Sequence, residues 1–599
     1  MSTVPSCLPN INIELYGHLS VSNESPEDED LDAIQALLRQ PRGEMEALSA
    51  QLLQLQAEMT EIHTRRQRLE AHIRPLRAIA SPIRRLPDDI LQEIFLWCLP
   101  GTHYPTLDPL QAPLLLTQIC RRWRYVANDT RRLWTSIHIP IPVLHIPSQS
   151  IPLVYAENER YKLKAKFIGI ADAFVAVVEA WIGRIGGCGL SFSVFQEDHQ
   201  SREEDACLQS VLEVLLRRST QWENVDIATP LRSVGAIVDL QPEDVPTMRS
   251  LSAWSTSRHQ LTRTGAFPFA LGGAGLAPQE LLPSWKCSRM FEAPLLESLS
   301  LFRIDEPLVV MPINWARLTS LAIEKQGTLA EFGYVDRAIV IDLPVIASVL
   351  RQCIHLQRAR LALTPCAPEP PSNHGELVEP IQLPSLVSLA FFEDKSSSLN
   401  LFKILETPCL RKLEFQTSRK PDPAAGNGVN YTFSLLPFLR RYGPKIEQLT
   451  LDTQYILPLD RVKCWETLPG LRKLRLRPST FESVKYPGDE QGMLPFTNCD
   501  LRQFQVPFSA PNVMPKLRSF ECTTLSTLSD RGVLELLKDR KRLGLRRAKL
   551  SYEKDWDRPV NNFAEEVGSL RVGMDIVLEK KIRPSFVQPR HGLKARRCR

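Results

Sequence analysis

The residues that most often carry chemistry are scattered through this 599-residue chain rather than grouped. Its thirteen cysteines include no C-x-x-C pair and its eleven histidines no H-E-x-x-H, so neither a zinc site nor a metalloprotease centre is indicated. The motifs G-x-x-x-x-G-K, G-x-G-x-x-G and G-x-S-x-G, which serve phosphate, dinucleotide and acyl chemistry, are missing as well. We therefore predict no catalytic residue, no metal, no cofactor and no enzymatic activity.

The remaining composition describes an ordinary folded protein. Lone cysteines such as Cys353, Cys409 and Cys522 occupy or adjoin positions where leucine is expected, so we predict that they are small core residues.

The most apolar longer run, 170–183, contains Asp172 and Glu179 and is too short to span a membrane. With 73 basic and 68 acidic residues, charge alone does not favour a nucleic-acid partner. Reduced thiols and the lack of a signal-like N-terminus predict an intracellular, cytoplasmic or nuclear, protein without a membrane.

Helices must account for the first part of the chain. Residues 1–30 are polar and end in acidic residues, so we predict disorder there, followed by a long helix over 31–80. An apolar residue recurs at alternating spacings of three and four between 45 and 76, with Arg66 as the one interruption. The members of this seam are Met45, Leu48, Leu52, Leu55, Met59, Ile62, Leu69, Ile73 and Leu76. The seam predicts either self-association as a coiled coil or packing against the rest of the chain.

Two apolar stretches follow the long helix. In RRLPDDILQEIFLWCL (84–99), Pro87 and two aspartates suit the first turn of a helix. The apolar residues of this helix form a wide stripe, so we expect other elements or a partner to cover it on more than one side. The second stretch, LTQICRRWRYVANDTRRLWTSI (116–137), also has helical spacing. We predict a bundle of about three helices that is too small to bury all of this surface, so that one apolar face docks on a partner.

The order I-R-R-L-P-D-D-I-L-Q-E-I-F, L-L-L-T-Q-I-C-R-R-W-R-Y-V-A and R-R-L-W resembles the F-box, most closely the F-box proteins numerous in mushroom-forming fungi. The resemblance implies an F-box at 81–140 that binds the Skp-type adaptor of a cullin-RING ubiquitin ligase, and cullin through it. By position it implies adaptor-facing roles for Leu86, Pro87, Ile90, Ile94, Phe95, Ile119 and Cys120. It also implies core roles for Trp123, Leu133 and Trp134. The competing interpretation is an unrelated small helical bundle.

A short motif recurs farther along the chain. The form P-x-L-x-x-L-x-L, with apolar exchanges, begins at residues 294, 384, 408, 444, 469 and 515. Proline ends a preceding helix and the L-x-L alternation suits a strand, while the intervening segments have helical spacing. We predict an irregular leucine-rich-repeat-like solenoid over 160–560, with the insertion 365–380 as a rim loop and 561–599 as a basic tail. The alternative is a conventional α/β sheet.

The predicted fold class is thus multidomain: an all-α N-terminal part, made of the long heptad helix and a three-helix F-box, followed by an α/β solenoid. Residues flanking the inward apolar pairs would line one face and contact a target protein, or be merely solvated. These are Lys412, Glu414, Gln448, Thr450, Lys473, Arg475, Ser519 and Glu521. The function that we predict is substrate recognition for a Skp/cullin/F-box ubiquitin ligase. The alternative is an F-box scaffold outside any ligase.

Overall fold

The structure is a computed structural model. It describes residues 25–101, 103–144, 153–199, 201–256, 283–302, 304, 307–324, 343–363, 379–393, 401–417, 435–453, 456–476, 500, 502, 513–522, 530–552 and 563–580. The chain divides into two units, one up to Leu91 and one from Gln92 onward, and each is described by itself. The predicted rim loop lies outside the described residues except for its last two, and so does the chain after residue 580.

A single long helix dominates the first unit. Helix α2 (Asp28–Ile79) has three acidic residues in its first turn, where they stabilise the positive end of the helix dipole. It therefore begins three residues before the predicted start, and the acidic end of the segment predicted to be disordered belongs to the helix. Pro41 and Pro75 lie inside it, and none of its residues is buried. The prediction of a long N-terminal helix is confirmed.

Short helices follow. They are α3 (Asp88–Trp97), α4 (Leu116–Ile119) and α5 (Arg121–Asp129), with a 3-10 turn at Arg131–Leu133. The connection before α4 is held to that helix because the Gln118 side-chain amide donates a hydrogen bond of 3.0 Å to the Pro109 carbonyl. The segment then passes directly into the first strand of the large sheet.

That sheet is parallel throughout and, within the described residues, contains fourteen strands. The strands lie side by side in chain order, with only the short pair β8 (Ile381–Gln382) and β10 (Leu405–Glu406) set apart. They are β1 (Ser136–Pro140), β2 (Leu190–Phe195), β3 (Trp222–Thr229), β4 (Ser250–Ser255), β5 (Ser298–Phe302), β6 (Ser320–Glu324), β7 (Arg358–Leu363), β9 (Ser388–Glu393), β11 (Lys412–Thr417), β12 (Gln448–Leu451), β13 (Lys473–Leu476), β14 (Ser519–Cys522), β15 (Arg547–Tyr552) and β16 (Asp575–Lys580).

The recurring leucine motif explains this order. In each copy the L-x-L pair forms the strand, and equivalent residues of neighbouring copies are register partners, as Leu413, Leu449 and Leu474 are. These side chains are at most 2 % exposed, and the first apolar residue of the motif, such as Leu410 or Leu471, is equally buried. Each copy therefore contributes one layer to a continuous apolar core.

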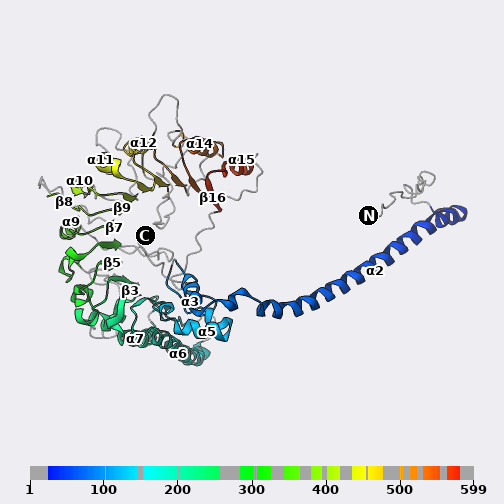
Figure 1. Ribbon diagram of the computed structural model, residues 1–599, viewed down its shortest axis with the longest axis horizontal. Coiled ribbons are helices and arrows are strands. Elements are labelled where there is room, and N and C mark those ends of the chain that lie inside the picture. Colours follow the sequence, from blue (N-terminus) through cyan, green and yellow to red (C-terminus); the bar gives the residue numbers. More distant parts are fainter. Residues whose placement is uncertain are drawn as a thin grey trace. The chain divides into compact units, whose positions relative to one another are not determined.

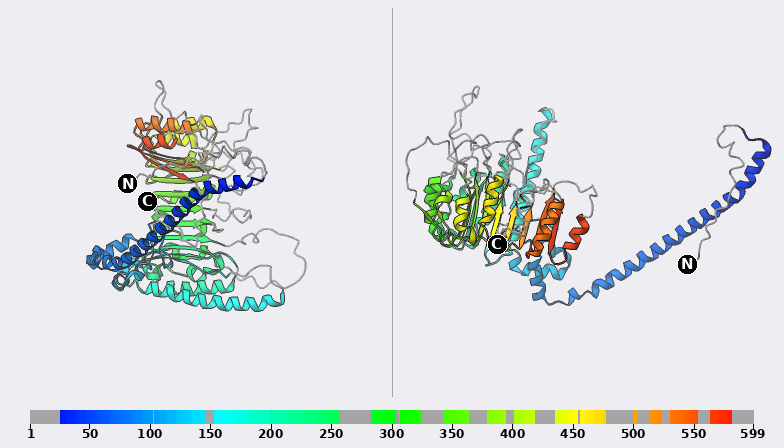
Figure 2. Two further views of the ribbon diagram at one scale, coloured as in Figure 1. Left: turned by 90° about the vertical axis from the view of Figure 1, so that its right-hand side faces the viewer. Right: turned by 90° about the horizontal axis from the view of Figure 1, so that it is seen from above.

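Helices cover one side of the curved sheet in the second unit, and the strands line its inner side (Figure 1). Figure 2 shows the strands stacked one above another along the array. The helices are α6 (Leu153–Gly183), α7 (Arg202–Leu216), α8 (Gly235–Val238), α9 (Leu343–Gln352), α10 (Leu401–Ile404), α11 (Leu435–Tyr442), α12 (Pro458–Glu466), α14 (Asp530–Arg542) and α15 (Phe563–Leu570). Among the described residues, none of the helices combines the length and the apolar character needed to cross a membrane.

Both ends of the sheet lie beyond the predicted boundaries of 160 and 560. Strand β1 belongs to the segment predicted as F-box and pairs with β2. At the other end, α15 and β16 lie where the basic tail was predicted, and β16 pairs with β15. These strands lack the proline-led leucine motif, so the motif did not predict them. Their apolar alternation, as in Ile137 and Ile139, still completes the buried layer.

Candidate protein-interaction surfaces

Helix α3 has a buried side and an exposed side. Leu91 and Phe95 are fully buried, whereas Ile90, Ile94 and Trp97 are 44 %, 36 % and 87 % exposed. Residues three or four apart share one side of a helix, so the exposed residues follow one helical stripe. Just before the helix, Pro87 is exposed and Leu86 is partly buried. Exposed apolar side chains at this spacing are typical of a helix that docks on a protein partner.

Phe95 does not belong to this exposed stripe, and its predicted adaptor-facing role is wrong. Its ring lies 4.9 Å from the ring of Trp123, centroid to centroid, and no part of its side chain reaches solvent. Trp123 itself is partly buried, while Leu133 and Trp134 are completely buried. Helical spacing indicated that Ile94 and Phe95 both belong to a wide apolar stripe, but it could not separate the side that faces the core from the side that faces solvent.

The end of α4 presents a second exposed apolar position. Ile119 is 55 % exposed, and Leu115, one turn earlier, is also exposed. Cys120 is exposed too, and its sulfur accepts a hydrogen bond of 3.4 Å from the Trp123 backbone N–H, which caps α5. Exposed Trp97 and Leu115 were not among the predicted contacts. Their only signal in the sequence is a large apolar residue at helical spacing, which is also the signal of a core residue.

Two tryptophans join the end of the F-box segment to the sheet. Trp134 packs edge-on against Trp181 of α6 with ring centroids 4.8 Å apart, and the Trp181 indole N–H donates to the Trp134 carbonyl at 3.0 Å. The Trp134 indole in turn donates to the Ala127 carbonyl of α5 at 2.9 Å. With the β1–β2 pairing, these contacts fix α5 and the following turn to α6 and to the first two strands of the sheet.

The eight predicted target-contacting residues lie on four adjacent strands in two straight rows, which we call the polar face. Lys412, Gln448, Lys473 and Ser519 form one row, and Glu414, Thr450, Arg475 and Glu521 form the other. All eight are partly buried and alternate with the buried core residues. The register therefore brings together residues that are more than one hundred positions apart.

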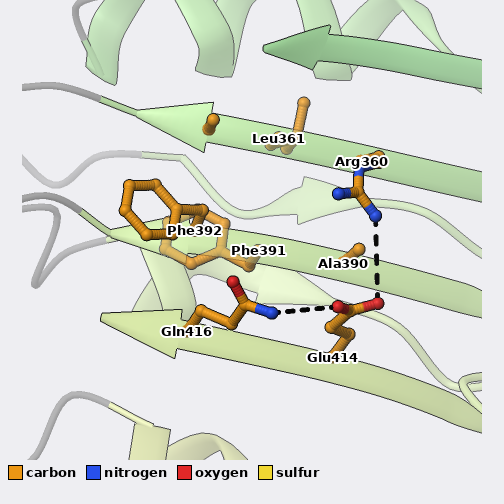
Figure 3. A pocket seen from close by; sticks show the side chains of 8 residues that line it. Arg360, Leu361, Ala390, Phe391, Phe392, Glu414 and Gln416 are labelled. Atoms are coloured by element: carbon orange, nitrogen blue, oxygen red, sulfur yellow. Dashed lines mark hydrogen bonds and ion pairs between the residues drawn. The ribbon is translucent and has the colours of Figure 1, made fainter. Parts of the chain in front are cut away.

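Three charged side chains of the polar face have charged partners on nearby strands of the sheet. Arg475 Nε lies 2.8 Å from Glu521 Oε2 on the next strand. At the β11 end of the polar face, Glu414 lies 3.9 Å from Arg360 of β7, across the small side chain of Ala390 on β9 (Figure 3). Glu414 also accepts a hydrogen bond from the side-chain amide of Gln416. These residues, together with Phe391 and Phe392, line a small pocket. The mixed charge and aromatic surface suits a protein segment that has polar and apolar side chains.

A row of arginines precedes the polar face at the start of the strands. Arg411, Arg472, Arg518 and Arg546 occupy equivalent positions, are all exposed, and are interrupted by Glu447. Glu447 lies 3.0 Å from Arg411 and 4.0 Å from Arg472, while the Arg518 side chain donates to the Gly544 carbonyl. We did not predict this arginine edge, although arginine recurs at the fourth position of the leucine motif.

The cysteines of the described repeats are mostly core residues. Cys353 and Cys522 are buried, but Cys409 is exposed, so its predicted core role is wrong: it lies one residue before the buried Leu410. Burial raises the pKa of the Cys353 thiol to about 12. The pKa of the Cys207 thiol is raised to about 11, mainly by burial and to a smaller extent by the negative charges of Asp172 and Glu204. Both thiols stay protonated at neutral pH and are poor nucleophiles.

These pKa shifts predict a division of thiol reactivity. At pH 8, iodoacetamide should alkylate Cys98, Cys120 and Cys409 of the native protein at least about 100-fold faster than Cys207 and Cys353, because the buried thiols are neutral and inaccessible. Peptide mass spectrometry after timed labelling measures the rates, and labelling in denaturant provides the control in which all sites react. Rapid labelling of Cys353 in the folded protein would show that this thiol is not buried.

Within the described residues, histidine, cysteine, aspartate and glutamate side chains form no group that could hold a metal ion. The fold and the exposed helical residues define a class: a chain in which a small helical module with exposed apolar side chains is joined to a parallel α/β array. Residues 83–140 match the F-box-like family model. The chain therefore carries an F-box-like domain, a kind of domain that typically binds Skp-type adaptors and commonly acts in ubiquitin ligases. No curated protein matches the chain.

Proposed function

We propose that the protein is a substrate receptor of a Skp/cullin/F-box ubiquitin ligase. The observation that carries this proposal is the F-box-like domain at 83–140, in which Ile90, Ile94 and Ile119 expose apolar side chains. The adaptor would cover them, and burial of each large apolar side chain contributes roughly 1.5 to 3 kcal/mol before ordering costs. Leu86, Pro87 and Cys120 complete the proposed adaptor-facing set, which no longer includes Phe95.

The array that follows the F-box would hold the target. We infer that it is a leucine-rich-repeat-like solenoid, because one parallel strand per repeat, in strict chain order, is the arrangement that repeat stacking produces. The polar face offers a continuous row of accessible side chains for a protein partner, and the arginine edge beside it favours targets with acidic segments. In this proposal, no residue of this chain takes part in the transfer of ubiquitin to the target.

The mechanism that we propose is proximity and orientation. A receptor must hold its target at a fixed place relative to the adaptor, so that a target lysine comes near the ubiquitin-charged conjugating enzyme. The Trp134–Trp181 contact and the β1–β2 pairing support this role, because they attach the segment after α5 directly to α6 and to the first strands of the sheet. We also propose that the seam of α2, including residues 45–76, binds a second copy of the chain.

Co-purification tests the proposed function. The full-length protein, expressed with an affinity tag in its own cells, should retain both the Skp-type adaptor and cullin, and its target should accumulate when the proteasome is inhibited. A variant lacking residues 401–580 should keep the adaptor but lose the target. Retention of the adaptor without cullin would instead support a scaffold outside a ligase, and retention of neither would refute the proposal.

A further inference from the structure

Helix α2 exposes an apolar seam that is longer than the segment 45–76. The same alternation of three and four residues continues toward the N-terminus through Leu38, Ile34 and Leu31, so the seam runs from Leu31 to Leu76. Within it only Pro41 and Arg66 are not apolar. None of these side chains is buried in the structure. A narrow stripe of this length is typical of a helix that pairs with another helix.

The charges of α2 are segregated along its length. Residues 28–46 contain six acidic residues and two arginines, for a net charge of −4. Residues 62–79 contain five arginines and one glutamate, for a net charge of +4. Two such helices side by side in parallel would bring like charges together at both ends, and would place Arg66 opposite Arg66 in the seam. Pairing in opposite directions brings each acidic end against a basic end.

We propose that α2 forms an antiparallel coiled coil with α2 of a second copy, with the two seams fully overlapped. In this register Leu31 faces Leu76 of the second copy, Leu38 faces Leu69, and Leu52 faces Leu55. Every seam layer is apolar except two that are related by the twofold axis, and in each of them Pro41 of one copy meets Arg66 of the other. The cost of the charged seam residue is thus confined to one layer in each half of the dimer, and Glu70, 2.9 Å from Arg66 within the same helix, offsets its charge.

The positions beside the seam agree with this register. In an antiparallel coiled coil, the g positions of one helix lie beside the g positions of the other, and the e positions beside the e positions. Glu44 therefore lies beside Arg65 of the second copy, both at g positions, and Asp28 lies beside Arg77, both at e positions. The twofold axis repeats each pair, so four attractive pairs form and no acidic residue faces another. In a parallel dimer Arg65 would instead lie beside Glu70 of the second copy, and Glu44 beside the uncharged Ser49.

Charge reversal distinguishes the two orientations. Sedimentation equilibrium of the full-length protein gives the dimer dissociation constant for the wild type, Glu44→Arg, Arg65→Glu and the double variant. Each single change should raise the constant about tenfold, because two symmetry-related attractions become repulsions. The double variant should return to within about threefold of the wild type. Arg68→Glu is the matched control, because it makes the same change on α2 away from the seam and should alter the constant less than about twofold.

Two other outcomes would overturn the proposal in different ways. If Glu44→Arg has no effect and the double variant is as weak as Arg65→Glu, the dimer is parallel and only the orientation is wrong. If the wild type stays monomeric at all concentrations, self-association itself is refuted. Adaptor capture, measured in parallel on the same variants, should not change in any of these cases. The proposed ligase function is therefore tested independently.

Discussion

Ile94→Lys should abolish capture of a Skp-type adaptor while leaving the fold intact. The Ile94 side chain is partly exposed on α3, so a lysine can reach solvent in the free protein and the free energy of unfolding should change by less than about 0.5 kcal/mol. In the complex the ammonium group would be buried in an apolar contact without a partner charge. We expect a loss of at least about 2 kcal/mol, or about 30-fold in the dissociation constant, measured by calorimetry with purified adaptor.

Matched variants separate a docking effect from a folding effect. Ile354→Lys makes the same substitution at a 49 % exposed position between α9 and β7, and should leave adaptor binding unchanged. Phe95→Ala removes a buried ring that contacts Trp123 and should lower stability by about 3 to 5 kcal/mol, so any loss of binding there reflects a loss of structure. Normal capture by Ile94→Lys would mean that the exposed side of α3 is not the adaptor surface.

Arg461→Ala should destabilise the second half of the array by about 3 to 5 kcal/mol. The Arg461 side chain on α12 is completely buried, and its Nη1 lies 2.8 Å from Asp500 Oδ2. Its Nε and Nη2 donate to the carbonyls of Ile456 and Thr453, at 2.9 Å and 2.8 Å. Burial lowers the pKa of the Arg461 guanidinium, and the Asp500 carboxylate opposes that shift. Removing the guanidinium would leave a buried carboxylate without its ion-pair partner and two carbonyls without these donors.

Urea denaturation followed by tryptophan fluorescence measures this change. Lys463→Ala, at an exposed position of the same helix, should cost less than about 0.5 kcal/mol and controls for effects on helix propensity. The pair Arg461→Met and Asp500→Leu should recover part of the loss, because neither charge is then buried alone. A cost below about 1 kcal/mol for Arg461→Ala would show that the ion pair does not hold the turn before α12.

Periodicity in the sequence was sufficient to predict the elements but not their outer limits. The seam predicted α2, and the leucine motif predicted strands such as β11 to β14, because a residue that recurs at a fixed spacing must meet the same surroundings each time. Strands β1 and β16 were outside the predicted array, since the first lies in the F-box segment and the second follows no proline-led motif. Each of these end strands is placed in the sheet by its hydrogen bonds to the neighbouring strand, and its own sequence carries no repeat motif.

The sequence by itself determined the helical module, the repeating strands and the residues that alternate with the core, including both rows of the polar face. Only the tertiary structure decided that Phe95 is buried while Ile94 is exposed. It also decided that Cys409 lies at the surface and that Arg461 forms an ion pair with Asp500. The physical reason is that spacing fixes which side of a helix or strand a residue occupies. What covers that side depends on elements far away in the chain.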